Sequence, residues 1–309
     1  MQVLFFFIDG FGLGDNDPQS NPYLLADTPW LDSLLGGKFL LRDTCPFHSP
    51  IAEVVPTDAC LGVPGIPQSA TGQTALFSGV NAPAYCGRHI NAFPPKVLRD
   101  LLDSYSVFKV FTERGLRATF INAYRDRFFV EMPRNRYKPS ASTVAVMSGG
   151  LMFRTIDDLL AGEAVYHDIC GAGLVAAGYA VPWQEPEQAG ASAARVAAQN
   201  DFSMFEYFLT DHIGHRQDEQ VAVECLQNLD RYLGAAVAGV DLNETLVVIS
   251  SDHGNIEDLR SNVHTLNPVP TILLGCGRAE VAKKIRNLTD IMPAIYDLLG
   301  FQVALPGRE

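Results

Sequence analysis

The strongest constraint on the fold is a run of apolar residues near position 250 that ends in a carboxylate and an imidazole. Residues 245–249 are apolar or β-branched throughout, and Asp252, His253 and Gly254 follow shortly after them. A run of this kind, without polar alternation, predicts a strand that is buried on both faces of a sheet. Asp252 and His253 would then lie at the carboxyl end of that strand, where open α/β sheets bind their ligands.

Two further runs, apolar or largely so, end in polar residues of the same kinds. Residues 3–8 precede Asp9, and residues 204–209 precede Asp211 and His215. Because the strands of a parallel sheet present their carboxyl ends at one edge, we expect these side chains to converge. The run 3–8 is also too short for a targeting segment and lacks a basic leader, so we interpret it as a buried strand.

Ser69 and His264 are the remaining candidates for the same site. Ser69 stands before a predicted helix over residues 70–77, and His264 precedes the apolar run 269–274. A hydroxyl at a helix N-terminus meets free backbone N–H groups and the positive end of the helix dipole. Such a position suits an oxyanion or a phosphoryl group.

Predicted strands and helices alternate along most of the chain. The strands are predicted over residues 3–8, 51–55, 117–122, 164–169, 204–209, 245–249 and 269–274, and the main helices over 70–77, 96–104, 107–114, 186–200, 218–238 and 290–299. This alternation predicts a three-layer α/β/α sandwich with a mainly parallel central sheet. We expect a single catalytic domain over residues 1–309, with a small cap insertion within 86–190, where the pattern is less regular.

Composition limits the partners and the compartment. The net charge of −12 and the pI near 5.0 argue against nucleic acid and anionic membranes as partners, because both need a positive surface. A small phosphorylated substrate would therefore have to be attracted locally, by metal ions or clustered arginines. The six cysteines are scattered and form no zinc-binding pattern, which favours a reduced, cytoplasmic protein.

The candidate ligands suit two divalent ions, zinc or manganese. Asp211, His215 and His264 can face one ion, and Asp9, Asp252 and His253, with the Ser69 hydroxyl, can face the other. Two such ions clamp the attacking and leaving oxygens of an in-line displacement and activate a serine nucleophile. Each motif alone has a structural alternative, such as a turn or a helix cap, but their joint occurrence at strand ends favours the two-metal interpretation.

These motifs together resemble the signature set of the alkaline phosphatase superfamily. The segments 252–255 and 264–270 are most similar to cofactor-independent phosphoglycerate mutase and phosphopentomutase, and the resemblance covers residues 1–79 and about 201 to the end. It implies the same two sets of metal ligands, with Ser69 carrying the phosphoryl group transiently. Ser69 has the family's spacing to Ser78-Gly79, and Thr71 is the alternative nucleophile.

The sequence also departs from the mutases. They carry histidine where this chain has Gln73, and their large cap exceeds what the interval from Ser69 to Asp211 can supply. A mutase must shield its phosphorylated intermediate from water, so a reduced cap favours hydrolysis. We therefore expect a phosphatase or phosphodiesterase, with a phosphomutase as the alternative and a catalytically silent metal-binding protein as the alternative of another class. A sulfatase is disfavoured, because residues 69–73 lack its C/S-x-P-x-R pattern.

Substrate contacts are the least constrained part of the site. The candidates are side chains that could hold a second phosphate or a carboxylate, namely Arg88, His89, Asn91, Arg125, Arg134 and Arg136. For the last three, a solvated loop with ion pairs to Asp126 and Glu131 is the structural alternative, and we favour it. His167 and Asp168 complete no ligand set, so we interpret them as a structural pair.

Overall fold

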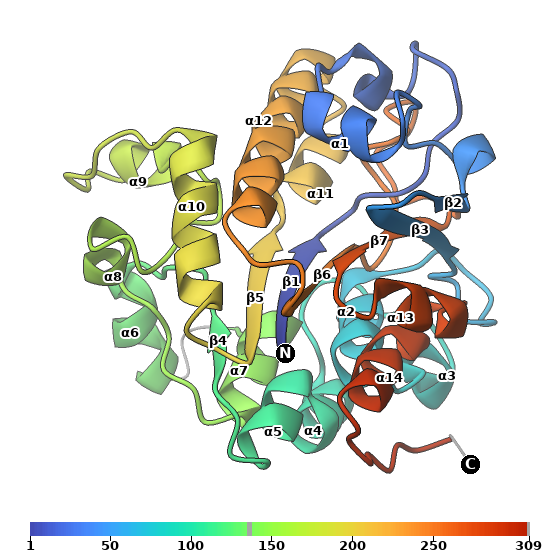
Figure 1. The fold of residues 1–309 in the computed structure, drawn as a ribbon. Helices are drawn as coiled ribbons and strands as arrows, with labels where there is room; N and C mark the ends of the chain where they lie inside the picture. The colour runs from blue at the N-terminus through green and yellow to red at the C-terminus, as the bar shows by residue number, and fades with distance from the viewer. Residues whose placement is uncertain (135–137, 308–309) are drawn as a thin grey trace.

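The centre of the fold is a mixed seven-stranded sheet in the order β2-β3-β7-β6-β1-β5-β4 (Figure 1). The structure is a computed structural model that describes residues 1–134 and 138–307. Its strands are β1 (Gln2–Ile8), β2 (Phe47–His48), β3 (Ala52–Thr57), β4 (Ala118–Phe120), β5 (Phe202–Tyr207), β6 (Thr245–Ser250) and β7 (Val269–Gly275).

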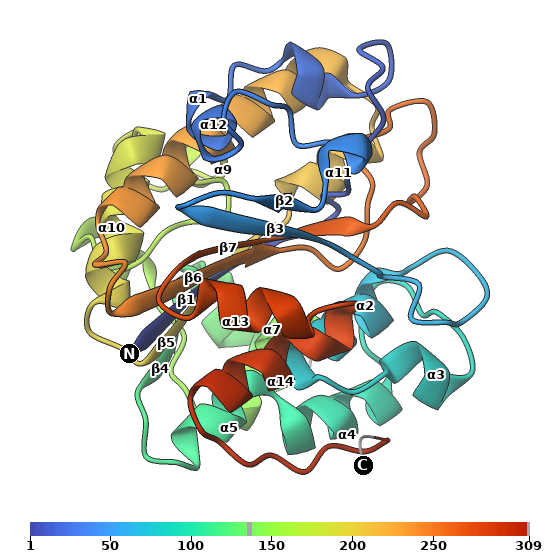
Figure 2. The ribbon, with the colours of Figure 1, turned by 45° about the vertical axis from the view of Figure 1, so that its right-hand side comes forward.

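Helices cover both faces of this sheet, as the second view shows (Figure 2). On one face lie η1 (Pro22–Leu25), α1 (Pro29–Leu34), α10 (Pro186–Ala197), α11 (Leu209–Gly214) and α12 (Glu219–Ala238). On the other face lie α2 (Ser69–Ser78), α3 (Ala82–Cys86), α4 (Lys96–Tyr105), α5 (Val107–Thr112), α7 (Ala141–Ser148), α13 (Arg278–Lys284) and α14 (Leu288–Leu298). The short elements η2 (Arg42–Thr44), α6 (Asp126–Glu131), η3 (Met132–Arg134), α8 (Ile156–Leu160) and α9 (Ala172–Ala176) complete the described chain.

Strand β1 shows why an all-apolar run becomes the central strand. Successive side chains of a strand point to opposite faces, so both faces of β1 must be covered. Phe7 packs edge-on against Phe77 of α2 on one face, and Phe6 packs edge-on against Tyr232 of α12 on the other. The predicted three-layer α/β/α sandwich is confirmed.

The sheet is less parallel than the alternation of elements suggested. β1 pairs in parallel with β5 and β6, and β4 with β5, whereas β7 is antiparallel to β6 and β3, and β2 is antiparallel to β3. Residues 251–268, all of them described, connect β6 to β7 without a helix. A parallel return needs a crossover, so β7 comes back antiparallel.

One predicted strand is absent from the described residues. Residues 164–169 form only an isolated bridge between Val165 and Asn122, and Ile169 has a φ of 66° that ends any extended backbone. The other predicted elements are found with ends shifted by a few residues. In the part of the chain that the structure describes, no helix is long and apolar enough to cross a membrane.

Candidate metal and nucleophile site

The candidate ligands come together at the carboxyl edge of the three central strands. β1 is hydrogen-bonded to both β5 and β6, so the residues that follow these strands are neighbours in space (Figure 1). Asp9 follows β1, Asp252 and His253 follow β6, and Asp211 lies on α11, directly after β5. These residues converge because their strands, which are far apart in the sequence, pair in parallel.

The first cluster contains Asp9, Asp252 and His253. Nε2 of His253 lies 3.4 Å from Oδ1 of Asp9 and 3.4 Å from Oδ2 of Asp252. One ligand atom from each residue lies within 4.8 Å of the others, and all three residues are buried. The Ser69 hydroxyl lies 3.1 Å from the same Nε2.

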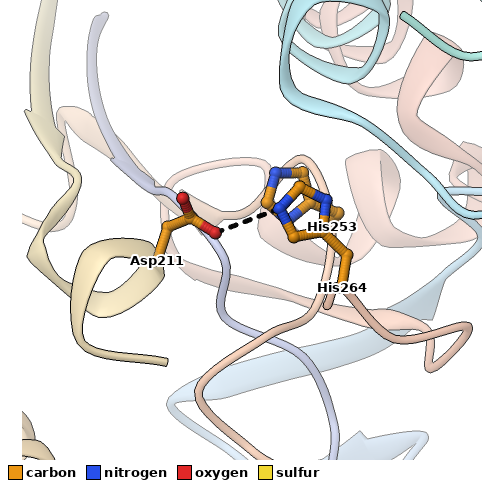
Figure 3. Close-up of side chains that lie close together, drawn as sticks. All are labelled: Asp211, His253 and His264. Atoms are coloured by element: carbon orange, nitrogen blue, oxygen red, sulfur yellow. Dashed lines mark ion pairs between the residues drawn. The ribbon is translucent and has the colours of Figure 1, made fainter. Parts of the chain in front are cut away.

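The second cluster contains Asp211, His253 and His264 (Figure 3). The two clusters therefore share His253. Nε2 of His264 lies 3.3 Å from Oδ1 of Asp211. His215 belongs to the same neighbourhood, because its Nε2 lies 3.4 Å from Oδ1 of Asp211 and 3.2 Å from Nε2 of His264. The structure therefore brings together all seven residues that the sequence analysis selected as metal ligands or nucleophile.

Backbone carbonyls fix the orientation of two imidazoles. Nδ1 of His264 lies 2.9 Å from the Pro67 carbonyl, and Nδ1 of His215 lies 2.7 Å from the Asn262 carbonyl. A carbonyl can only accept, so each Nδ1 must donate and each neutral ring carries its lone pair on Nε2. Both lone pairs face Oδ1 of Asp211. These acceptors repel one another unless they share a cation, either a proton on one imidazole or a metal ion, and three such groups around one point fit a metal site.

Buried oxygens without hydrogen-bond partners show whether the first cluster also fits a cation. Among the described residues, Oδ1 of Asp9 and both carboxyl oxygens of Asp252 are buried without a hydrogen-bond partner. Buried polar atoms without a partner are costly and rare, and they cluster where an ion or ligand completes the site. Both clusters therefore fit divalent cations.

The electrostatics of the cluster agree with this fit. Burial raises the pKa of Asp9 well above its ordinary value, and the charge of Asp252 raises it further. Burial, assisted by Asp211, raises the pKa of Asp252 to about 7, and burial lowers the pKa of His253 to about 3. The chain thus holds carboxylates that repel one another beside a neutral imidazole, and a bound cation would relieve that repulsion.

Ser69 owes its position to the start of helix α2. It is the first residue of the helix and is half-buried, at the end where helical N–H groups have no intrahelical partner. The alternative nucleophile, Thr71, is fully buried. Its hydroxyl donates to the Gln68 carbonyl at 3.1 Å and accepts from the Ile90 N–H at 3.1 Å. These contacts favour Ser69.

Close packing of α2 brings the serine to the metal cluster. A Cβ atom at Gly72 would lie only 2.8 Å from the Asp252 carbonyl oxygen, so a larger residue would push the helix away. Gln73 then reaches Asp9, with Nε2 donating to Oδ2 at 3.1 Å. The residue that departs from the mutase pattern therefore orients a candidate metal ligand.

Three further polar residues support the site, and the sequence analysis gave none of them a role of its own. Asn255 donates to Oδ1 of Asp211 at 2.7 Å. Glu257 is buried and accepts from the backbone N–H groups of Gly12 at 3.0 Å and Asn255 at 2.7 Å. Glu206, inside β5, lies close enough for its charge to contribute to the raised pKa of Asp9, and burial raises the pKa of Glu206 itself to about 7. The only signal for Glu206 is a carboxylate within an otherwise apolar run.

The predicted substrate contacts stay at the surface. Arg88, Asn91, Arg125 and Arg134 are exposed, His89 lies 3.2 Å from the Val63 carbonyl through Nε2, and Arg136 lies outside the described residues. In the same segment, Arg127 pairs with Glu131 at 2.8 Å, which is an ion pair of the kind that the solvated-loop alternative predicts. Asp168 accepts from the N–H groups of Gly171 and Gly173 and caps α9, which is a structural role.

Part of the sequence matches known proteins. Residues 175–303 match the Metalloenzyme superfamily. The chain is 33% identical over 106 residues to the 2,3-bisphosphoglycerate-independent phosphoglycerate mutase of Desulforudis audaxviator, and 33% identical over 107 residues to that of Cereibacter sphaeroides. Each match covers 32% of this chain and 21% of the relative, so the similarity spans about a fifth of the mutases' length.

Solved structures are similar over nearly the whole chain. A phosphoglycerate mutase of Leishmania mexicana, studied at low cobalt concentration, superposes with a TM-score of 0.59 at 10% identity, covering 99% of this chain and 96% of that one. The alkaline phosphatase of the Antarctic bacterium TAB5 superposes with a TM-score of 0.53 at 12% identity, covering 98% of each chain. At such identities the likeness shows a shared fold.

Proposed function

We propose that this chain, an alkaline phosphatase superfamily metalloenzyme that resembles the phosphomutases, hydrolyses a small phosphate ester through a phosphoserine at Ser69. The observation that carries the proposal is the Ser69 hydroxyl, 3.1 Å from Nε2 of His253 and beside two clusters of metal-type ligands. A small phosphorylated substrate and a cytoplasmic location are parts of the same proposal.

Two divalent ions, zinc or manganese, would be held by the ligands described above. Asp9, Asp252 and His253, with Ser69, would hold one ion, and Asp211, His215 and His264 the other. Bound ions of this kind lower the pKa of a hydroxyl and offset the charge that develops on the transferred group. The buried, unpartnered oxygens of Asp9 and Asp252 support this assignment.

The chain's own residues account for the two transfer steps. Oγ of Ser69 forms a bond to phosphorus while the bond to the ester oxygen breaks, and the serine proton ends on the departing alcohol. Water then attacks the phosphoserine, which restores the Ser69 hydroxyl and releases inorganic phosphate. In both steps the N–H groups of Ser69 and Ala70, at the start of α2, donate to the phosphoryl oxygens, whereas the Thr71 N–H already donates to the Ile90 carbonyl at 3.3 Å.

A mutase is the second candidate, because the sequence relatives bear that name. We favour hydrolysis because the region that could cover Ser69 is small. Within the described part of residues 86–190, α4, α5 and α7 cover one face of the sheet, and the short helices α6, α8 and α9 lie beyond the edge strand β4 (Figure 1). We propose that these three short helices are all that remains of a cap, which leaves the phosphoserine open to water.

The test is turnover by the metal-loaded chain of three substrates: the monoester phenyl phosphate, the diester diphenyl phosphate, and 3-phosphoglycerate. Hydrolysis should release inorganic phosphate, whereas a mutase would move the phosphoryl group within phosphoglycerate without releasing it. Ser69→Ala should abolish turnover at unchanged metal content, and Ser104→Ala, an exposed serine on α4, serves as the matched control. Full activity of Ser69→Ala would contradict the phosphoserine step. An absence of turnover by the metal-loaded wild type would favour a catalytically silent metal-binding protein.

A further inference from the structure

We infer that Glu257 is a positioning residue that fixes the two ligand clusters relative to one another, with one of its carboxyl oxygens serving each cluster. The inference rests on the metal assignment made in the proposed function. Glu257 lies in the connection between β6 and β7, which also carries Asp252 and His253, and only 3% of its surface is exposed. It belongs to neither cluster, so it acts on the ligands through their neighbours in the chain.

One oxygen, Oε2, joins the two segments that carry the first cluster. It accepts from the Gly12 N–H at 3.0 Å and from the Asn255 N–H at 2.7 Å. Gly12 stands three residues after Asp9, and Asn255 stands two residues after His253. The segments that leave β1 and β6 are therefore held by one shared acceptor.

The other oxygen, Oε1, holds the segment that carries His264. It accepts from the hydroxyl of Thr265, which directly follows His264, and from Nδ2 of Asn267 at 3.1 Å. The Thr265 N–H also donates to the Gly254 carbonyl at 3.0 Å, so this segment lies alongside the one that leaves β6. Oε1 thereby places the imidazole that completes the Asp211 cluster.

Two glycines allow the chain to close around this carboxylate. A Cβ atom at Gly12 would lie 2.2 Å from Oε1 of Glu257, and a Cβ atom at Gly254 would lie 2.1 Å from the same oxygen. Atoms without a bond do not pack so closely, so a larger residue at either position would displace the carboxylate. The segments after β1 and β6 thus approach Glu257 more closely than side chains would permit.

The hydrogen bonds offset the cost of burying the carboxylate. Burial removes its hydration, and four donors, two for each oxygen, take the place of water. A fully satisfied buried group makes the segments that it joins more rigid. Ligands of a metal need to be held within about 0.5 Å of their productive positions, and groups that orient them typically contribute about 10- to 100-fold in affinity.

Glu257→Gln should separate the two halves of this arrangement. The amide oxygen should take the Oε2 position, because both partners there are backbone N–H groups, and the amide NH₂ would then face Nδ2 of Asn267, donor against donor. Zinc binding to the Asp211 cluster should weaken by about 10- to 100-fold, whereas binding to the Asp9 cluster should stay within about threefold of wild type. Adding Asn267→Asp exchanges donor and acceptor at unchanged net charge, and should restore most of the lost affinity.

Calorimetric zinc titration of the metal-free chain measures both affinities without turnover. Asp9→Asn and His264→Gln, each of which removes a ligand of one cluster, identify the two binding steps. Urea unfolding of the metal-free variants records any effect on the fold itself. Glu53→Gln is the matched control, since Glu53 is a buried glutamate on β3 that contacts His48, and both zinc affinities should remain unchanged in that variant.

Thr265→Val provides a second measurement, because it removes one bond to Oε1 and leaves both bonds to Oε2. It should weaken the Asp211 cluster selectively, by about tenfold. Equal weakening at both clusters in proportion to the lost free energy of unfolding, or unchanged zinc affinity in both variants, would overturn this inference. Absence of zinc binding to wild type would overturn it together with the metal assignment. Failure of the phosphoryl-transfer proposal alone shows instead as zinc-bound wild type without turnover of any ester, and would leave the role of Glu257 standing.

Discussion

The imidazole rings of His253 and His264 stack with their centroids 3.6 Å apart and their planes 13° from parallel. His253 belongs to both ligand clusters, and His264 reaches the site from the loop between β6 and β7. Each ring therefore limits the movement of the other, and the stack joins the two clusters into one centre. Binding at the two clusters should be coupled as a result.

This coupling can be measured through His264. His264→Gln should weaken zinc binding to the Asp211 cluster by more than about 100-fold, because loss of even a supporting group beside a ligand typically costs about 10- to 100-fold. It should also weaken binding at the Asp9 cluster, because His253 loses its stacking partner. Calorimetric titration of the metal-free chain would resolve both sites, with His48→Gln at the surface as the control. An unchanged Asp9 site would show that the clusters act independently.

Substitutions of the two candidate nucleophiles, Ser69 and Thr71, should have different effects on the phosphoenzyme and on stability. Ser69→Ala should eliminate the phosphoenzyme without changing stability, because Ser69 is only half-buried at the start of α2. Thr71→Val should keep the phosphoenzyme but lower the free energy of unfolding by about 1 kcal/mol, since it loses hydrogen bonds to Gln68 and Ile90. Acid-quenched labelling and urea unfolding would measure the two effects. A phosphoenzyme that persists in Ser69→Ala and disappears in Thr71→Val would reverse the assignment.

Asp252→Asn should raise the thermal stability of the metal-free chain but lower the stabilisation that metal binding provides. Asp252 is fully buried, and burial raises its pKa to about 7, so the ionised group destabilises the metal-free fold above that pH. The amide should raise the melting temperature of the metal-free chain at about pH 8 and reduce the stabilisation that zinc gives to wild type, leaving the part that comes from the Asp211 cluster. Thermal unfolding with chelator and with zinc would show both effects. A lower melting temperature in chelator would contradict this account.

Glu206 should make stability depend on pH. Burial raises its pKa from 4.5 to about 7, so between these values the folded chain binds more protons than the unfolded chain. The free energy of unfolding should therefore fall as the pH rises through this window, by up to a few kcal/mol. Urea unfolding of the metal-free chain across the window should show a weaker fall for Glu206→Gln and an unchanged fall for the exposed control Glu244→Gln. Equal falls in all three chains would exclude the contribution of Glu206.

The sequence alone determined the sheet's central strands and the residues that end them. An apolar run such as residues 3–8 must be covered on both faces, and Asp9 must then lie at the strand's carboxyl end. The sequence therefore places Asp9, Asp252 and Asp211 each at a strand's carboxyl end, and the parallel pairing of β1 with β5 and β6 in the structure brings them together. Periodicity encodes the burial of an element, which is a local property.

The tertiary structure decided which distant groups meet. His264 lies in a connection without periodicity, and only the antiparallel return of β7 places it on His253. Val165 lies in an apolar run of the kind that forms strands, yet it forms only a single bridge, to Asn122. The contacts of Glu257 depend in the same way on segments that meet only in the folded chain. Such contacts are set by long-range packing, on which the local pattern carries no information.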